Sequence, residues 1–175
     1  MRHNHVIQYE NIMLRPLAED DIEALRTWRN DEENTRFLRK LPYITREAQR
    51  KWFQDYLLRQ DEMCFAIEET QDINQLVGSL SLYDIKNNSC LYGKLLVGEK
   101  KAHGKHVGVN ATSAAVKIAF EQIGLETVRL FVFADNEVAI KVYKAAGFEI
   151  TDQHKADDGK IEFTMVMTRE VSANE

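Results

Sequence analysis

The stretch from Leu95 to Phe120 constrains the fold of this chain more than any other. It opens with an apolar run typical of the end of a buried strand, and a polar loop with glycines follows. Beyond the loop, small and apolar residues recur at helical spacing as far as Gly124, where a helix typically stops. The first N–H groups of a helix have no partner within it and carry positive potential. The sequence therefore predicts a phosphate-binding loop between a strand and a helix.

The glycine spacing argues against two common kinds of phosphate loop, although a P-loop enzyme stays open as a further class. A Walker loop has four residues between its first glycine and a Gly-Lys pair, which Ser or Thr then follows. Here five residues separate Gly98 from Gly104, and His106 follows Lys105. The dinucleotide pattern GxGxxG is absent as well. The alternative that stays open is an ordinary strand-to-helix turn.

A second strand and helix follow the first pair. Residues 128–133 are typical of a strand, Asn136 is a typical helix cap, and residues 137–146 form an amphipathic helix closed by Gly147-Phe148. Tyr143 lies two helical turns beyond Asn136, so the two side chains share a face. A strand, a helix and a strand in succession favour parallel pairing of the two strands with a right-handed crossover.

In this order, the two units resemble the acyl-CoA site of the GNAT superfamily N-acetyltransferases. The family's loop pattern is Gln/Arg-x-x-Gly-x-Gly/Ala, and His103, His106 and Gly108 stand at its three defined positions. Only Gly108 fits that pattern. The family's second pattern, an Asn, a Tyr seven residues later and then Gly-Phe, is matched in full by Asn136, Tyr143 and Gly147-Phe148. The resemblance spans residues 95–148.

The resemblance implies an α/β (α+β) fold with a mixed, mostly antiparallel sheet of six to seven strands flanked by about four helices. A parallel pair of strands would surround the acyl-CoA site. We expect a single domain over residues 1–175, with its core in about 10–169 and a loose lead-in over 1–9. The expected strands are 12–15, 63–68, 76–83, 90–97, 128–133, 148–153 and 160–167, and a short helical segment is expected over 32–38.

The resemblance also implies acetyl-CoA as the co-substrate. Its pantetheine arm would lie along the strand end at Leu96 and Val97, and its pyrophosphate on the loop and helix start. The residues expected to bind it are Leu96, Val97, His103, Gly104, Lys105, His106, Val107, Gly108, Val109, Asn136 and Tyr143. Asn136 also fits a purely structural role as a helix cap. The five histidines show no metal-ligand spacing, so no metal is expected.

The family resemblance assigns Tyr143 as the general acid that protonates the leaving sulfur. A phenol stays protonated at neutral pH and can donate that proton; the alternative is an amphipathic core tyrosine. The general base is not identified. Its candidates are Glu99, His103, His106, Tyr83 and Tyr92, or a chain of water molecules.

The acceptor is a primary amine whose identity stays open. Residues 25–31 resemble the subset that contains ribosomal-protein and nucleotide-amino-sugar N-acetyltransferases. On this resemblance Trp28, Arg29 and Asn30 would bind the acceptor, with stacking by Trp28 and phosphate pairing by Arg29. The alternative places Trp28 in the core. Protein N-termini, polyamines and aminoglycosides are further candidate acceptors, and a non-catalytic acyl-CoA-binding module is the competing class.

Composition limits the partners. The formal charge of −5 argues against a nucleic-acid partner, and no apolar run is long enough to span a membrane. Cys64 and Cys90 both stand in predicted strands, which suggests buried thiols in a reducing compartment. We therefore expect a cytoplasmic protein, and a homodimer is one expected assembly.

Overall fold

A single mixed sheet of eight strands organises residues 2–35 and 42–169, the residues that the computed structural model describes. The strand order is β1-β2-β3-β4-β5-β6-β8-β7, and only the β5–β6 pair is parallel. The strands are β1 (Ile7–Tyr9), β2 (Ile12–Pro16), β3 (Met63–Glu69), β4 (Gln75–Lys86), β5 (Ser89–Val97), β6 (Thr127–Phe133), β7 (Glu149–Lys155) and β8 (Ile161–Thr168). The expected mixed sheet with one parallel pair is confirmed.

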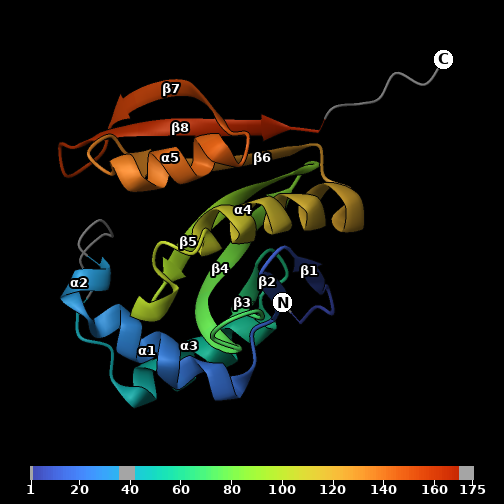
Figure 1. The fold of residues 1–175 in the computed structure, drawn as a ribbon. Helices are drawn as coiled ribbons and strands as arrows, with labels where there is room; N and C mark the ends of the chain where they lie inside the picture. The colour runs from blue at the N-terminus through green and yellow to red at the C-terminus, as the bar shows by residue number, and fades with distance from the viewer. Residues whose placement is uncertain (1, 36–41, 170–175) are drawn as a thin grey trace.

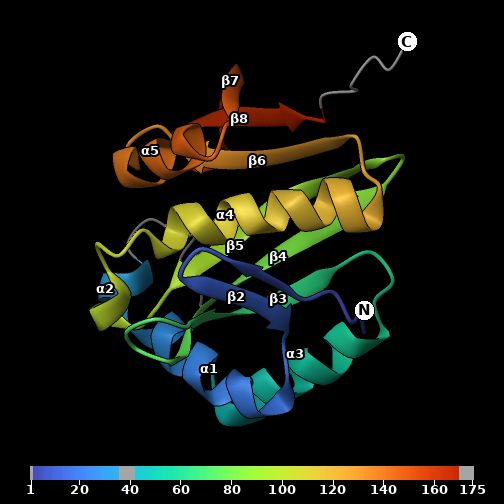
Figure 2. The same cartoon turned by 45° about the vertical axis from the view of Figure 1, so that its right-hand side comes forward.

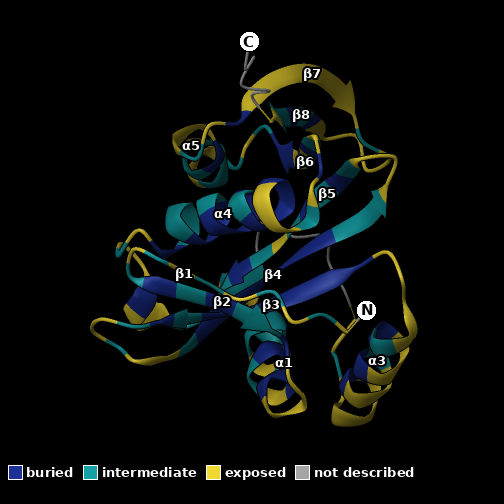
Figure 3. Ribbon diagram, turned by 90° about the vertical axis from the view of Figure 1, so that its right-hand side faces the viewer, coloured by how far each residue is buried: buried dark blue, intermediate teal, exposed yellow. Residues whose placement is uncertain are grey.

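Helices cover both faces of this sheet (Figures 1 and 2). They are α1 (Ile22–Asn30), α2 (Glu32–Thr35), α3 (Arg46–Leu58), α4 (Val107–Lys117, continued by a π-helical turn over Ile118–Ile123) and α5 (Glu137–Ala145). The helices α1 and α3 pack against Cys64 and Ala66 on one face of β3. The opposite face of the same strand, with Phe65 and Ile67, belongs to the larger core under α4. Figure 3 shows buried residues gathered in the central strands and exposed ones along β7.

The first nine residues differ from the sequence-based expectation. They were expected to be a loose lead-in, but Ile7–Tyr9 pairs with Ile12–Leu14 as strand β1. His3 also docks on the sheet, with its Nε2 3.0 Å from the carbonyl oxygen of Cys64. The expectation was wrong because strand pairing and docking, rather than local polarity, decide the conformation here. The helical segment expected over 32–38 is present as α2, and residues 36–38 lie outside the described residues.

The strands β5 and β6 part soon after they meet. They pair only from Ser89 to Leu91, opposite Thr127 to Arg129. Beyond Leu91, β5 stays paired with β4 but has no described neighbour on its β6 side. Its outer backbone groups are therefore open along the strand half that leads to the predicted phosphate loop.

Two features of β5 fit this parting. Tyr92 is the first residue beyond the last β6 pair, and its buried ring packs against Tyr143 and Phe148 at centroid distances of 5.9 and 6.1 Å. A β-bulge follows: Gly93 pairs with Ser81 but Leu96 pairs with Ser79, so β5 has one extra residue. Lys94 takes up that residue with φ +54°. Bulges bend a strand and redirect its side chains, and this one lies at the centre of the site.

Candidate active site

The start of α4 is an open set of backbone donors. His106 is its N-cap residue but makes no capping side-chain hydrogen bond, and the first intrahelical bond runs from Asn110 N to His106 O at 3.0 Å. The N–H groups of Val107, Gly108 and Val109 precede that bond and are left to a ligand or to water. An anion is the ligand that three such donors and a helix dipole favour.

His106 keeps the backbone conformation that the family's glycine would provide. Its φ and ψ are +59° and +11°, in the left-handed region that glycine enters most easily. The substitution at this signature position therefore changes the side chain but not the path of the loop. Gly104, with φ +77°, makes the second left-handed turn of the loop, and a Cβ there would meet open space.

The loop is fastened to its surroundings on both sides. His103 Nε2 lies 3.0 Å from the carbonyl oxygen of Val97, which ties the loop to the end of β5. Lys105 forms an ion pair with Asp72 in the β3–β4 turn, and its carbonyl accepts a hydrogen bond of 3.1 Å from Asn11 Nδ2. The histidine at the family's Gln/Arg position thus joins two elements that were both expected to touch acetyl-CoA.

The helix α5 meets the start of α4 at Gly108. A Cβ built on Gly108 would lie 3.7 Å from Val142, which is ordinary van der Waals contact. The next residue along, Tyr143, is buried and packs edge-on against Tyr92 and Phe148. Burial, followed by the nearby Tyr83 hydroxyl, raises the pKa of Tyr143 to about 12. Tyr143 therefore holds its proton throughout the neutral range.

Asn136 caps α5 with its side chain, since its Oδ1 accepts from Ala139 N at 3.2 Å. The predicted spacing places it at the start of the helix that carries Tyr143. The structural alternative, helix capping, is thus realised. A side-chain amide also carries N–H donors, so capping through the oxygen leaves Asn136 able to donate to a ligand.

On the other face of the sheet, Trp28 packs directly on the turn that follows β5. A Cβ on Gly98 would lie 2.1 Å from Trp28 Cγ, so only glycine admits the indole ring there. The Asn34 side chain approaches the carbonyl oxygen of Gly98 at 3.5 Å, and Lys100 pairs with Glu33 of α2. The α1–α2 segment and the turn after β5 therefore form one connected wall.

The Asn30 side chain makes structural hydrogen bonds within the same wall. Its amide donates to the carbonyl of Ile44 at 2.9 Å and accepts from Ile44 N at 2.9 Å. These two hydrogen bonds to the backbone of Ile44 hold the end of α1 against the segment that leads into α3.

Arg29 is the unusual member of the predicted acceptor group. Burial lowers its pKa, and the nearby charges of Cys64 and Glu62 act in the opposite direction. Within residues 2–35 and 42–169, no carboxylate forms an ion pair with it. A half-buried guanidinium without an ion-pair partner among the described residues favours an anionic ligand.

A polar cluster next to Arg29 was missed by the sequence reasoning. The buried carboxylate of Glu62 binds both Lys94 and Arg59, and Cys64 Sγ lies 3.3 Å from Ser81 Oγ. Burial works to raise the pKa of Glu62, but the hydrogen bonds and charges of Lys94 and Arg59 outweigh it and lower that pKa. A lysine beside a glycine inside an apolar strand is the signal that indicates such a bulge.

A family model described as an acetyltransferase (GNAT) domain matches residues 11–149. The chain belongs to the GNAT acetyltransferase family. Acetyltransferase PseH of Campylobacter jejuni subsp. jejuni (strain 81-176) is 30% identical over 139 residues, which cover 79% of this chain and 83% of that protein. An N-acetyltransferase 9-like protein of Caenorhabditis briggsae is 23% identical, covering 85% and 80%.

Solved GNAT structures share the fold. Spermidine N-acetyltransferase of Vibrio cholerae, in complex with CoA and spermine, matches with a TM-score of 0.82 at 18% identity, covering 94% of this chain and 99% of that one. A GNAT-family acetyltransferase of Bacillus anthracis matches with a TM-score of 0.79 at 17% identity, covering 94% and 98%. The GNAT fold uses acetyl-CoA, and this chain is an acetyltransferase of that fold.

Two other findings bear on the site. No group of three or more His, Cys, Asp or Glu side chains in the described part of the chain is placed to hold a metal ion. A search of the same residues finds no helix with the length and apolar character needed to cross a membrane.

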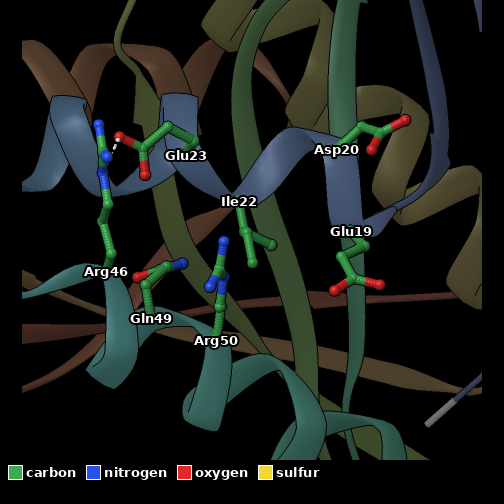
Figure 4. Close-up of a pocket in the computed structure, with 7 residues that line it drawn as sticks. All are labelled: Glu19, Asp20, Ile22, Glu23, Arg46, Gln49 and Arg50. Carbon is green, nitrogen blue, oxygen red and sulfur yellow. Dashed lines mark hydrogen bonds and ion pairs between the residues drawn. The ribbon is translucent and has the colours of Figure 1, made fainter.

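A surface hollow lies away from these elements (Figure 4). It is lined by Glu19, Asp20, Ile22, Glu23, Arg46, Gln49 and Arg50. All seven belong to α1, the short turn before it, or α3. The ion pair between Arg46 and Glu23, at 3.3 Å, occupies one end. Because β5, α4 and α5 contribute nothing to it, this hollow is not the candidate active site.

The open start of α4 yields the first prediction. Gly108→Glu places a carboxylate among the three free N–H groups and should abolish acetyl-CoA binding by charge repulsion and by filling the anion site. Gly108→Ala adds only a Cβ in ordinary contact with Val142, so it should fold and bind acetyl-CoA within a few-fold of wild type. Isothermal titration with acetyl-CoA measures both, and an unchanged affinity in folded Gly108→Glu would place the pyrophosphate elsewhere.

Proposed function

We propose that the protein transfers the acetyl group of acetyl-CoA directly to the primary amine of a nucleotide-linked amino sugar. The observation that carries the choice of acceptor is Arg29, half-buried and without an ion-pair partner among the described residues. Its neighbours reinforce the argument, because Lys94 and Arg59 share the single carboxylate of Glu62. Among the described residues, Glu62 is thus already paired with two other cations, and an acceptor that brings phosphate groups would supply a counter-ion to Arg29.

A polyamine is the rival acceptor, because the structurally similar Vibrio cholerae enzyme is a spermidine N-acetyltransferase. Its identity of 18% supports a shared fold and not a shared acceptor. Spermidine would bring further positive charge beside Arg29 and Lys94, where desolvation makes like-charge contact unfavourable. Protein N-termini and a non-catalytic acyl-CoA-binding role are weaker alternatives, because neither accounts for the half-buried cation.

The residues that bind acetyl-CoA are arranged along the molecule from its pyrophosphate to its pantetheine arm. The N–H groups of Val107 to Val109, and the loop from His103, hold the pyrophosphate. The open edge of β5 at Leu96 and Val97 binds the pantetheine arm as an added strand would. Lys105 contributes attraction at the rim, where Asp72 competes for it. Asn136 donates to the arm from the start of α5.

Tyr143 supplies the proton that the leaving group needs. The acceptor nitrogen attacks the thioester carbonyl carbon, the new C–N bond forms and the C–S bond breaks. Tyr143 donates its hydroxyl proton to the departing sulfur, giving the free thiol. Its burial keeps the donor protonated and excludes water from the reacting bond.

The acceptor class is tested by a panel of amines. Release of free CoA is measured with a nucleoside-diphosphate amino sugar, the same sugar without its nucleotide, spermidine and a peptide N-terminus. Charge-assisted hydrogen bonds are worth about 1.5–3 kcal/mol, so we expect kcat/KM for the nucleotide-linked sugar to exceed that for the bare sugar by about tenfold to a hundredfold. Arg29→Gln should remove most of that difference.

Arg26→Gln is the matched control for Arg29. Arg26 stands on the same helix but is already paired with Glu23 at 2.8 Å, so its loss should leave the acceptor preference unchanged. A wild-type enzyme that prefers spermidine to the nucleotide-linked sugar would contradict the proposed acceptor.

Tyr143→Phe tests the general acid. The variant keeps the ring that packs between Tyr92 and Phe148 and removes only the hydroxyl. General acid catalysis contributes about 10²–10⁴ in rate, and a thiolate leaves readily, so kcat should fall by about 10² with acetyl-CoA binding unchanged. Because the pKa of Tyr143 is about 12, the wild-type rate should show no loss from its deprotonation between pH 6 and 9. Wild-type turnover by Tyr143→Phe in a chemistry-limited assay would contradict the assignment.

A further inference from the structure

The positions of the candidate side chains reduce the number of residues that could take the proton from the acceptor amine. An amine acceptor arrives largely as an ammonium ion and must release a proton before or during attack. Of the sequence-based candidates, Glu99 accepts a hydrogen bond from Lys101 N at 3.1 Å, and His103 binds the carbonyl of Val97. His106 forms the exposed left-handed N-cap of α4. Glu99 and His103 are therefore engaged by the loop's own backbone, and His106 stands at its exposed corner.

Tyr92 is on the wrong face as well. It is fully buried under α4, and its hydroxyl lies 2.9 Å from Thr112 Oγ1, which in turn donates to the carbonyl of Gly108 at 2.7 Å. Because Thr112 has a single hydroxyl proton and gives it to Gly108, Tyr92 donates its own proton to Thr112. Tyr92 is therefore enclosed under α4, with its hydroxyl directed at Thr112 rather than at an acceptor.

Tyr83 is the candidate that lies on the acceptor face. Side chains alternate along a strand, so Tyr83 shares a face with Ser81, whose Oγ contacts Cys64 beneath α1 and α3. The ring of Tyr83 covers Gly93 of β5: a Cβ built on Gly93 would lie 3.4 Å from both Cε1 and the hydroxyl oxygen. Gly93 is two residues beyond the last β5–β6 pair, so this hydroxyl stands where the two strands separate.

The bulge at Lys94 holds Tyr83 in this position. The left-handed conformation of Lys94 turns its side chain onto the same face, where Nζ lies 4.7 Å from the centroid of the Tyr83 ring. Glu62 fixes the other side of that ammonium through their ion pair. Tyr83 itself is only half-buried, so part of this residue is exposed to solvent.

We infer that Tyr83 is the catalytic residue on the acceptor side, relaying a proton from the attacking amine to solvent while Tyr143 serves the sulfur from α5. The assignment rests on the proposed N-acetyl transfer. The two phenols approach the parting of β5 and β6 from opposite faces of the sheet. The two hydroxyl groups also interact electrostatically. Burial is the main cause that raises the pKa of Tyr143, and the Tyr83 hydroxyl raises it further.

The proton balance closes with both tyrosines neutral at the end of the cycle, and Tyr143 is a phenolate only until its proton is replaced. The acceptor ammonium passes one proton to the Tyr83 oxygen as the Tyr83 hydroxyl proton moves to a solvent water molecule. The nitrogen lone pair then forms the C–N bond, the C–S bond breaks, and Tyr143 protonates the sulfur. The second proton on nitrogen leaves by the same relay and restores Tyr143 through solvent. One acetyl group, one amine and one proton released to solvent are accounted for.

The charged groups around Tyr83 define its pH behaviour. Among the described residues they include Lys94 on β5, which faces the ring, Glu62, which pairs with that lysine, and Tyr143 on α5; Asp84 is the next residue on β4. Lys94 and Glu62 are paired with each other, and Asp84 is paired with Lys86 at 2.7 Å. The titration that the test follows is therefore that of the acceptor amine.

A pH series on Tyr83→Phe tests the relay with whichever amine the wild type acetylates. At pH 7 we expect kcat/KM for the acceptor to fall by about 10², with KM for acetyl-CoA unchanged. The deficit should shrink as the pH rises past the pKa of the acceptor amine, because a free amine needs no relay. A structural role would give a loss that does not depend on pH, and either that result or wild-type activity would overturn the assignment.

Tyr9→Phe removes a hydroxyl from the edge strand β1 and should behave as wild type throughout. Should Tyr83→Phe lose acetyl-CoA binding, Gly93→Val gives the second test. A Cβ there would already touch the Tyr83 ring at 3.4 Å, so the two γ-methyl groups of valine displace the ring while the hydroxyl is kept. Gly93→Val should then show the same pH-dependent deficit, and wild-type behaviour would overturn the relay. Preference for spermidine in the amine panel would contradict the anionic acceptor and leave this test intact, so the two failures are distinguishable.

Discussion

The parting of β5 from β6 is the constraint on which the rest of the site depends. Three residue pairs join the strands, and beyond Leu91 the backbone of β5 is open on that side. Tyr92, Tyr143 and Phe148 fill the space on the α4 side with an aromatic cluster, so the strands do not close again. An open, hydrogen-bond-ready strand edge beside an uncapped helix start is suited to an extended chain that ends in a pyrophosphate.

The two faces of the sheet divide the reaction. In the mechanism that we propose, the open N–H groups and Tyr143 on the α4 side bind the cofactor and protonate its leaving group. On the α1 side, Trp28 packs on Gly98, and Lys94 at the bulge contacts both the Glu62 carboxylate and the Tyr83 ring. Since Gly98 and Gly93 lie in or just after β5, the same strand positions the groups on both sides. Because Gly98 and Gly93 have no Cβ, the aromatic rings of Trp28 and Tyr83 can approach the backbone of β5 and of the turn after it.

Much of this architecture could be predicted from the sequence, because its signals are local. The strand–loop–helix at residues 95–120 and the pattern Asn136, Tyr143, Gly147-Phe148 report backbone geometry that short-range residues determine. The left-handed N-cap at His106 shows why the irregular loop pattern was still informative: the conformation persists although glycine is replaced. Strand β1 was missed because polar residues such as Gln8 acquire their structure only by pairing with β2.

The acceptor side was harder to predict for a physical reason. Glu62, Lys94, Tyr83 and Arg29 come from four separate elements, and only the sheet register and the bulge bring them together. No local pattern reports that a buried carboxylate holds a lysine over a tyrosine ring. Trp28 shows the same difficulty, because the sequence left open whether it belongs to the core or to the acceptor site. In the structure it packs both against the core under α1 and α3 and on Gly98 in the turn after β5.

The most direct test of the central claim is a crystal structure of the protein with CoA bound. The pyrophosphate should lie on the N–H groups at the start of α4, the pantetheine arm should follow the open edge of β5, and the thiol sulfur should stand within hydrogen-bond reach of the Tyr143 hydroxyl. CoA bound in the hollow between α1 and α3, or with its sulfur remote from Tyr143 and the β5–β6 parting, would contradict the account.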